Sequence, residues 1–324
     1  MNAATLVTVI VPTYNRRNTI VRALHSVLNQ SYKHIEVIII DDGSTDDTEA
    51  VLAPYMDRIR YIRQSNQGQA AARNAGLKLA QGTLIANLDS DDIWHAEFLS
   101  KCVQQLEAND LDFVFTNWHQ ETKEGQWIDS FSRYFFLDDY IKAAKGAKWI
   151  DIEYLSLRKL YLKYCPSPSS SFLIRRSKIE TGWNEDMHVA DDWCLLLDVV
   201  LSRPCKVAFT TDVLWRKGVN DINVCDGRNV VELAKLLYIE DTKNLMMRFK
   251  KMVNNTEYRI FEIVYIENLI KLGSYHILRE RKMMTGLNLW REAAFNAPAM
   301  TLKGIWNIFL RKTMRSVGIV QQGA

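Results

Sequence analysis

The strongest structural signal in the sequence is the segment Ile35-Glu-Val-Ile-Ile-Ile-Asp-Asp-Gly-Ser44. Its apolar, β-branched run is unbroken after Glu36, which predicts a strand covered on both faces, as in parallel sheets. The two carboxylates and the glycine that follow predict a tight turn at the carboxyl end of this strand. Similar apolar runs at residues 7–11 and 84–88 predict further buried strands.

Segments with helical periodicity alternate with these strands, and further short strands are expected between them. The helices are expected at 18–30, 45–56, 68–80 and 96–107, and the added strands at 60–63, 113–116 and 171–175. This alternation predicts right-handed βαβ crossovers and an α/β domain with a mainly parallel, doubly wound sheet. In such sheets, ligands bind beyond the carboxyl ends of the strands.

The second half of the chain is less regular. Residues 117–165 are rich in aromatic side chains, and we expect a helical excursion or lid that contacts an acceptor, or else ordinary packing aromatics. Residues 230–324 read as helices and contain 15 Lys+Arg against 8 Asp+Glu, so a basic helical C-terminal region is expected. The alternating apolar and basic residues of Leu302–Val320 predict either a helix on an anionic membrane surface or a helix docked on its own domain.

Composition excludes several classes of protein. The 324 residues are 48% hydrophobic and 24% charged, which is typical of a globular protein, and the net charge of +3 gives no reason to expect nucleic acid. No apolar run reaches the roughly 18 residues of a membrane span, and the first residues do not resemble a signal peptide. Five cysteines without a CxxC pair argue against a disulfide framework or a zinc site. We therefore expect a cytoplasmic protein.

Two acidic clusters fall where the predicted strands end. One is Asp41-Asp42-Gly43-Ser44, and the other is Asp89-Ser90-Asp91-Asp92. Carboxylates gathered at one edge of a sheet repel each other, and a hard divalent cation such as Mg²⁺ or Mn²⁺ relieves this repulsion. Such a cation commonly also binds phosphate oxygens, so a nucleotide diphosphate is the expected ligand. The alternative is that both clusters are capped turns. Neither GxGxxG nor GxxxxGK[ST] is present, which disfavours a dinucleotide oxidoreductase and a P-loop NTPase.

Four motifs in order carry a resemblance to a known family. They are Val9-Ile-Val-Pro-Thr-Tyr-Asn-Arg16, Ile40-Asp-Asp-Gly-Ser-Thr-Asp46, Asn66-Gln-Gly68 with Ala72-Arg-Asn-Ala-Gly76, and Leu88-Asp-Ser-Asp-Asp92. Together they resemble the family 2 glycosyltransferases of the GT-A fold, over about residues 5–217. The resemblance implies transfer of a sugar from a nucleotide diphosphate donor, commonly UDP-linked, with inversion at the anomeric carbon.

The resemblance also implies roles for individual residues. Asp42 would accept a hydrogen bond from a uracil N–H, Asp89 would approach the ribose or the metal, and Asp91 would ligate the metal. Asp92 is a second candidate for metal binding. The remaining nucleotide contacts would come from Pro12, Thr13, Tyr14, Gln67, Gly68 and Arg73, with Tyr14 stacking on the base. For Arg73, a position on the helix surface is the alternative.

Inverting transfer needs a general base for the acceptor hydroxyl, distinct from the metal ligands. The segment Ala190-Asp191-Asp192-Trp193 matches the family pattern of an acidic residue, Asp and Trp. By this match Asp192 is the catalytic base, and Asp191 takes the place of the usual Glu. The alternative is that both aspartates only cap the helix that follows.

One position departs from the family pattern. The family often carries a His three residues after an aromatic residue, but here the segment reads Trp215-Arg216-Lys217-Gly218. Either Lys217 or Arg216 neutralises the diphosphate, or the metal keeps an extra water. His188, shortly before the Asp pair, is a possible substitute or a structural residue.

The sequence therefore predicts a GT-A catalytic domain over residues 1–229 and a basic helical region over residues 230–324. The nucleotide-binding half is expected at 5–116 and the acceptor half at 117–229. The predicted function is inverting, metal-assisted transfer from a UDP-sugar to a hydroxyl of a glycan or lipid-linked acceptor in cell-surface polysaccharide synthesis. Peripheral contact with the anionic inner face of the cell membrane is expected, and no nucleic acid. The alternatives are a nucleotidyltransferase and a non-catalytic sugar-nucleotide-binding protein of the same fold.

Overall fold

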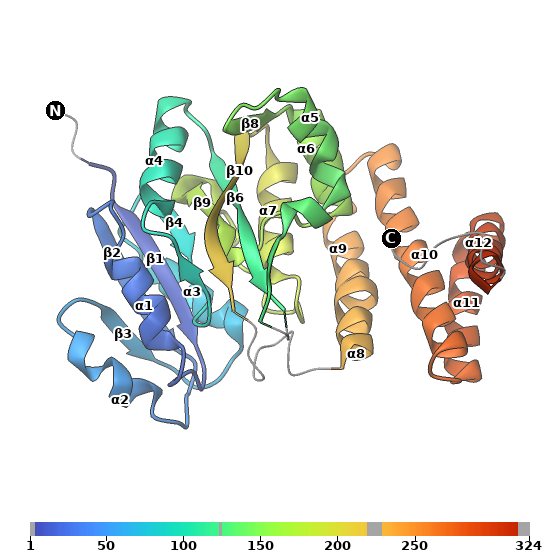
Figure 1. Ribbon diagram of the computed structural model, residues 1–324, viewed down its shortest axis with the longest axis horizontal. Helices are drawn as coiled ribbons and strands as arrows, with labels where there is room; N and C mark the ends of the chain where they lie inside the picture. The colour runs from blue at the N-terminus through green and yellow to red at the C-terminus, as the bar shows by residue number, and fades with distance from the viewer. Residues whose placement is uncertain (1–3, 123–124, 219–228, 317–324) are drawn as a thin grey trace. The chain divides into compact units, whose positions relative to one another are not determined.

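The computed structural model describes residues 4–122, 125–218 and 229–316 (Figure 1). The chain divides into two compact units, Met1–Gly227 and Arg228–Ala324, which we call the N-terminal unit and the C-terminal unit. Cys225 and the end of the basic segment Leu302–Val320 lie outside the described residues.

The first half of the N-terminal unit is the predicted parallel sheet. Its strands run in the order β3-β2-β1-β4, and each neighbouring pair is parallel. The strands are β1 (Val7–Thr13), β2 (Ile35–Asp41), β3 (Arg60–Arg63) and β4 (Leu84–Asn87). The Val and Ile side chains of β1 and β2 are almost all fully buried, which confirms that this part of the sheet is covered on both faces.

The second half of the sheet is mixed. Strand β9 (Phe172–Arg175) runs antiparallel between β4 and β6 (Phe113–Glu121), and β6 pairs in parallel with β10 (Val207–Lys217). Three short strands pair antiparallel at this end: β5 (Ile93–Trp94) with β10, β7 (Trp127–Asp129) with β6, and β8 (Trp149–Ile152) with β10. The two longest ladders, β1 with β2 and β6 with β10, are parallel, and the predicted fold class is confirmed.

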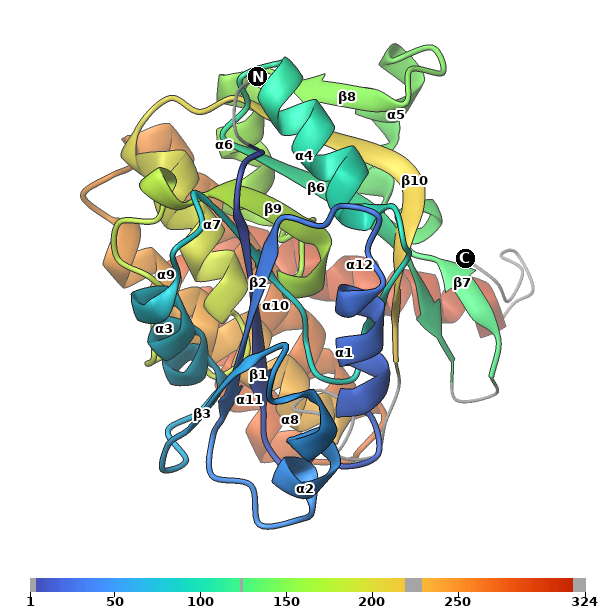
Figure 2. The same cartoon turned by 90° about the vertical axis from the view of Figure 1, so that its left-hand side faces the viewer.

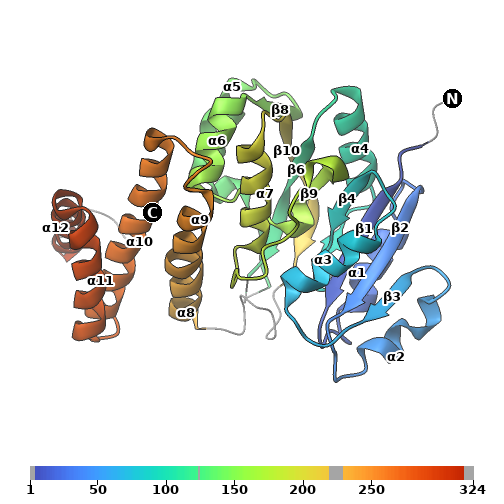
Figure 3. The ribbon, with the colours of Figure 1, turned by 180° about the vertical axis from the view of Figure 1, so that it is seen from behind.

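Helices cover both faces of the sheet. Figures 1 and 3 show the two faces, with α1 and α4 on one and α3 and α7 on the other, and Figure 2 shows α1 and α3 flanking the sheet. The helices of this unit are α1 (Ile20–Leu28), α2 (Thr48–Leu52), α3 (Gln69–Leu79), α4 (Phe98–Ala108), α5 (Asp138–Ala143), α6 (Tyr154–Lys163) and α7 (Asp191–Ser202). Small residues bring α3 close to β1, since a Cβ at Gly76 would lie 2.5 Å from the Ile10 Cγ2 atom.

The expectation of a helical excursion or lid over 117–165 is wrong in part. Strand β6 continues to Glu121 and turns back as β7, and β8 joins the sheet through β10. The strand β10 was not predicted at all. These strands exist because of pairing between segments distant in sequence, which local periodicity does not show.

The C-terminal unit is helical, as predicted. It contains α8 (Val230–Lys235), a π-helical turn (Leu236–Asp241), α9 (Thr242–Phe249), α10 (Asn255–Leu278), α11 (Met283–Asn296) and α12 (Pro298–Ser316). Helices α10 and α11 pack closely, since a Cβ at Gly286 would lie 2.5 Å from the Gly273 carbonyl oxygen. No helix in the described ranges is long and apolar enough to cross a bilayer.

Helix α12 combines features of both predicted alternatives for the basic segment. Ile305 and Ile308 pack against the core of the C-terminal unit, so the helix is docked on its own unit. Leu302 and Trp306, by contrast, are 71% and 64% exposed. Among the side chains of this helix that the structure describes, those facing outward are therefore both apolar and basic.

Candidate active site

The first motif ends β1 at the carboxyl edge of the parallel strands. Pro12 and Thr13 are buried there, and the Thr13 Oγ1 atom has no hydrogen-bond partner among the described residues. Tyr14 follows directly and is 43% exposed. The strand end therefore provides a buried floor and an accessible aromatic ring, which suits the predicted stacking on a base.

The first and second motifs are held together by Asn15. Its Oδ1 atom accepts a hydrogen bond from the Thr45 N–H at 2.7 Å, and its own N–H donates to the Ser44 Oγ atom at 2.9 Å. Asn15 has a positive φ of 53°, in the left-handed region where Asn is one of the few residues tolerated. The bonds to the second motif offset this cost and fix the turn.

Asp42 anchors the loop that carries Gln67 and Gly68. Its carboxylate accepts hydrogen bonds from the N–H groups of Gln67 at 2.9 Å and Gly68 at 2.7 Å, and from the Gln64 side chain at 2.8 Å. Gly68 has a φ of 91° and directly precedes α3. The structure thus brings these three predicted nucleotide-binding residues into one hydrogen-bonded cluster.

Arg73, in the third motif, contacts the fourth motif and the segment Ala190-Asp191-Asp192-Trp193. Its side chain is 2% exposed, and its guanidinium forms ion pairs with Asp191 and, at 2.6 Å, with Asp89. Burial alone opposes the positive charge, but the Asp191 and Asp89 carboxylates outweigh it and raise the pKa of Arg73. The alternative of a helix-surface cation is wrong, because Arg73 lies on the inner side of α3 between two carboxylates.

The two aspartates at the start of α7 have different surroundings. Asp191 is 1% exposed and accepts a hydrogen bond from the Gln69 side chain at 2.9 Å besides its ion pair with Arg73. Asp192 is less buried and accepts a hydrogen bond from the Ser169 N–H at 2.9 Å. Asp191 therefore connects α7 to α3. Among the described residues, no cation is in direct contact with the Asp192 carboxylate.

The environment of Asp192 suits proton transfer. Burial and the neighbouring Asp191 charge raise the pKa of Asp192 to about 6. A general base works best when its pKa lies near the working pH, and perturbed carboxylates of this kind are typical of active sites.

The acidic loop after β4 is fixed by Ser170. The Ser170 Oγ atom donates to Asp92 at 2.6 Å and accepts from the Asp89 N–H at 3.0 Å. The second oxygen of Asp92 accepts from the Gly218 N–H at 3.2 Å. Asp91 is also buried, and its nearest cation is Arg16 at 3.8 Å. Asp91 thus keeps more of its coordination capacity than Asp92.

The carboxylates of Asp91 and Asp92 fit a hard cation that takes its remaining oxygen ligands from a bound diphosphate. Burial and Asp89 raise the pKa of Asp91, and burial and Asp91 raise the pKa of Asp92. Such crowded carboxylates favour a cation between them. Over the described ranges, no group of three or more His, Cys, Asp or Glu side chains is arranged to hold a metal. One or two carboxylates plus diphosphate oxygens is the usual arrangement for Mg²⁺.

Lys217 stands near the position of the missing family His. Its positive charge lowers the pKa of both Asp91 and Asp92, which opposes the effect of burial. His188 is exposed in the turn before α7. The field of Lys217 thus acts on the acidic loop, as expected of a group that neutralises a diphosphate.

Sequence reasoning missed four residues of this site: Arg16, Gln69, Ser169 and Ser170. The run Ser169-Ser-Ser171 received no functional role from the sequence. A cluster of hydroxyl groups directly before a returning strand, opposite two acidic motifs, was the available signal. The Ser170 hydroxyl donates to Asp92, and Ser169 donates to Asp192 through its backbone N–H.

Comparison with known proteins agrees with this geometry. The model of glycosyl transferase family 2 matches residues 8–183. An uncharacterized glycosyltransferase of Rickettsia felis is 42% identical over 134 residues, which are 41% of this chain and 22% of that protein. The chain thus spans only about a fifth of that relative. The glucosyltransferase WfaP of Escherichia coli is 33% identical over 238 residues, which are 72% of this chain and 85% of WfaP.

Solved structures show the same fold. Residues 1–349 of TarS from S. aureus, in complex with UDP-GlcNAc, superpose with a TM-score of 0.65 at 17% identity, covering 91% of this chain and 82% of that one. The mannosyltransferase PcManGT from Pyrobaculum calidifontis, in complex with GDP-Man and Mn²⁺, gives a TM-score of 0.58 at 17% identity, covering 99% and 82%. From the ordered motifs, the sheet topology and these matches, it follows that the chain belongs to glycosyl transferase family 2 and has the GT-A fold.

Proposed function

We propose that this chain is an inverting glycosyltransferase that moves a sugar from a UDP-sugar to a hydroxyl of a lipid-linked acceptor. One observation carries the proposal: polar contacts and short stretches of chain link the nucleotide motifs to the candidate base. Asp42 holds Gly68 just before α3, Gln69 and Arg73 of α3 both bind Asp191, and Asp192 follows Asp191 in the same turn of α7. The relative WfaP is named a UDP-Glc:α-D-GlcNAc-diphosphoundecaprenol β-1,3-glucosyltransferase, which supports the donor and the acceptor.

In the proposed reaction, the acceptor oxygen attacks the anomeric carbon of the donor. The bond from that carbon to the diphosphate oxygen breaks with inversion, and UDP leaves. Asp192 removes the proton of the attacking hydroxyl, and its raised pKa suits it to this step. Asp191 is a positioning residue, because its ion pair with Arg73 fixes the first turn of α7.

The donor is oriented by the nucleotide motifs. Tyr14 stacks on the base, and Asp42 accepts from the uracil N–H while its other bonds keep the loop with Gln67 and Gly68 in place. Asp91, with Asp92 as the second candidate, would hold Mg²⁺ or Mn²⁺. When bound, such a cation stabilises the charge of the departing diphosphate. Lys217 adds positive charge at the same loop.

The acceptor half contains a stack of aromatic rings. Phe136 stacks on Tyr164 with ring centroids 4.2 Å apart and on Tyr134 at 4.9 Å. Phe135, beside them, is 72% exposed. Tyr164 is followed within a few residues by Ser169, which binds Asp192. We therefore assign acceptor binding to this stack, where aromatic rings can cover the apolar face of a sugar.

A transfer assay with defined substrates tests this function. The full chain is incubated with GlcNAc-diphosphoundecaprenol and UDP-Glc, UDP-GlcNAc or GDP-Man, with and without Mn²⁺, and the products are analysed by mass spectrometry and NMR. We expect transfer from a UDP-sugar, loss of transfer with EDTA, and a β-linkage from an α-linked donor. Release of pyrophosphate from UTP would instead indicate a nucleotidyltransferase, and donor binding without transfer would indicate a binding protein.

A further inference from the structure

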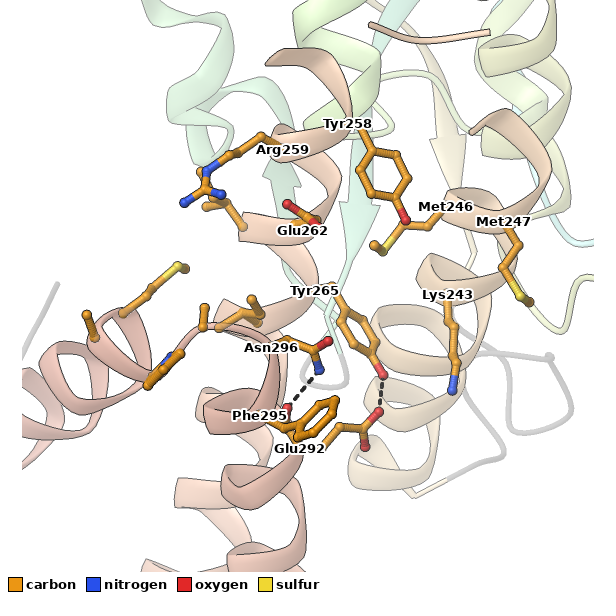
Figure 4. A pocket seen from close by; sticks show the side chains of 16 residues that line it. Lys243, Met246, Met247, Tyr258, Arg259, Glu262, Tyr265, Glu292, Phe295 and Asn296 are labelled. Carbon is orange, nitrogen blue, oxygen red and sulfur yellow. Dashed lines mark hydrogen bonds between the residues drawn. The ribbon is translucent and has the colours of Figure 1, made fainter. Parts of the chain in front are cut away.

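The C-terminal unit contains a cleft that the proposed chemistry does not use. Its volume is about 800 Å³, within the range of ligand sites, and it is lined by residues of α9, α10, α11 and the first turn of α12 (Figure 4). All of its lining residues belong to this one unit. Its walls are mainly apolar and include Met246, Met247, Ile263, Phe295, Pro298 and Met300.

The charges in the cleft balance. Lys243 and Arg259 line it together with Glu262 and Glu292, so two cations meet two carboxylates. Tyr265 donates to the Glu292 carboxylate at 2.6 Å (Figure 4). A lining without net charge, with apolar walls, fits an uncharged apolar ligand better than an anionic group.

Large apolar side chains are exposed at the mouth of the cleft. Phe295 is 89% exposed and Met247 is 63% exposed. Met284 and Leu287, 71% and 43% exposed, precede Phe295 at spacings that place them on the same face of α11. From Met284 to Phe295 these three apolar side chains span about 16 Å along the helix, and the exposed Asn288 and Arg291 lie on the same face between Leu287 and Phe295. The surface therefore suits a ligand that is longer than the cleft itself.

We propose that the cleft and the α11 strip (Met284, Leu287 and Phe295) bind the isoprenoid chain of the lipid-linked acceptor. This inference rests on the proposed function for the identity of the ligand. An isoprenoid chain is uncharged, which matches the balanced lining, and it is long, which matches the strip. Methionine side chains are flexible and adapt to an irregular branched chain, and Met246, Met247 and Met300 all line the cleft.

Vesicle flotation of the full chain tests the proposal without any sugar donor. Three vesicles are compared: phosphatidylcholine alone, phosphatidylcholine with undecaprenyl phosphate, and phosphatidylcholine with phosphatidylglycerol at equal surface charge. We expect the chain to float mainly with undecaprenyl phosphate. The double variant Met247→Ser/Phe295→Ser should lose most of this binding, and because both side chains are exposed it should keep the wild-type melting temperature.

A matched variant controls for the loss of surface apolarity. Met56→Ser/Leu155→Ser removes two exposed side chains of the N-terminal unit, 38% and 61% exposed, and should float like the wild type. Equal capture by phosphatidylglycerol vesicles, or unchanged flotation of Met247→Ser/Phe295→Ser, would overturn the proposal. So would self-association of the wild type that the double variant abolishes, since a second copy would then occupy the strip.

The outcome is separable from that of the transfer assay. Selective flotation without transfer supports the isoprenoid site and leaves the proposed reaction unsupported. Sugar transfer together with flotation that does not depend on undecaprenyl phosphate supports the proposed reaction and overturns the isoprenoid site.

Discussion

Among the described residues, the N-terminal unit has five exposed large hydrophobic side chains, whereas the much shorter C-terminal unit has nine. The N-terminal unit instead buries charge, with Arg73 between Asp89 and Asp191 and with Asp91 and Asp92 below the surface. Burying charge costs free energy, and such networks are kept where they position reacting groups. An exposed apolar patch marks a surface that binds something. We therefore assign the proposed chemistry to the first unit and the proposed apolar ligand to the second.

The largest effect is expected from Asp192→Asn, which removes the proposed base but keeps the shape of the side chain. Turnover should fall by about 10²–10⁴-fold, the usual contribution of general base catalysis. UDP binding, measured by calorimetry, should stay unchanged, because Asp192 lies outside the nucleotide motifs. The control Asp186→Asn changes an exposed aspartate of the same segment and should retain activity. Full activity of Asp192→Asn would remove the base from the mechanism.

The second effect concerns the buried charge of the N-terminal unit. Arg73→Met leaves Asp191 buried without its cation, so the free energy of unfolding should fall by about 3–5 kcal/mol in urea denaturation. Arg22→Met, at an exposed position of α1, is the control and should change stability by less than about 0.5 kcal/mol. The double variant Arg73→Met/Asp191→Leu should recover stability but not turnover. Recovery of both would show that the network only stabilises the fold.

The third prediction is the pH dependence of kcat/KM. With the pKa of Asp192 at about 6, the base is protonated at lower pH, so kcat/KM should fall about tenfold between pH 7 and pH 5. A raised pKa means that the folded state holds this proton more tightly than the unfolded state, where the pKa is about 3.9. The contribution of Asp192 to stability therefore decreases as the pH rises from about 4 to 6, and its protonation does not unfold the protein at pH 5. A profile that stays flat down to pH 5 would contradict the assignment.

The smallest effect is expected in the acceptor half. Phe136→Leu removes the ring between Tyr134 and Tyr164, and the loss of aromatic contacts should raise the KM for the acceptor by about two- to tenfold. The KM for the donor should not change. Tyr55→Leu, an aromatic residue of the nucleotide-binding half, serves as the control. A change in donor KM alone would place the stack at the donor instead.

The local elements of the nucleotide-binding half could be read from the sequence, because each has its own periodicity. The expected strand at 60–63 and helix at 68–80 agree with β3 and with α3 at Gln69–Leu79. Strands β7, β8 and β10 could not be predicted in this way, because they are stabilised by pairing with distant segments. The predicted roles of the site residues remain predictions. The structure adds that Arg73 pairs with both Asp89 and Asp191, and that Asp42 holds the loop directly before the helix that carries Arg73.

Residue order alone was sufficient for the fold class, the family resemblance and the candidate carboxylates, because strand ends, periodicity and motif spacing are properties of neighbouring residues. Three features depend on segments far apart in the chain: the partners of Arg73, the two serines that hold Asp92 and Asp192, and the cleft lined by α11. Burial and charge pairing arise only when such segments pack together. For this reason the candidate carboxylates could be identified from the sequence, whereas the burial and the charged partners that shift their pKa values could not.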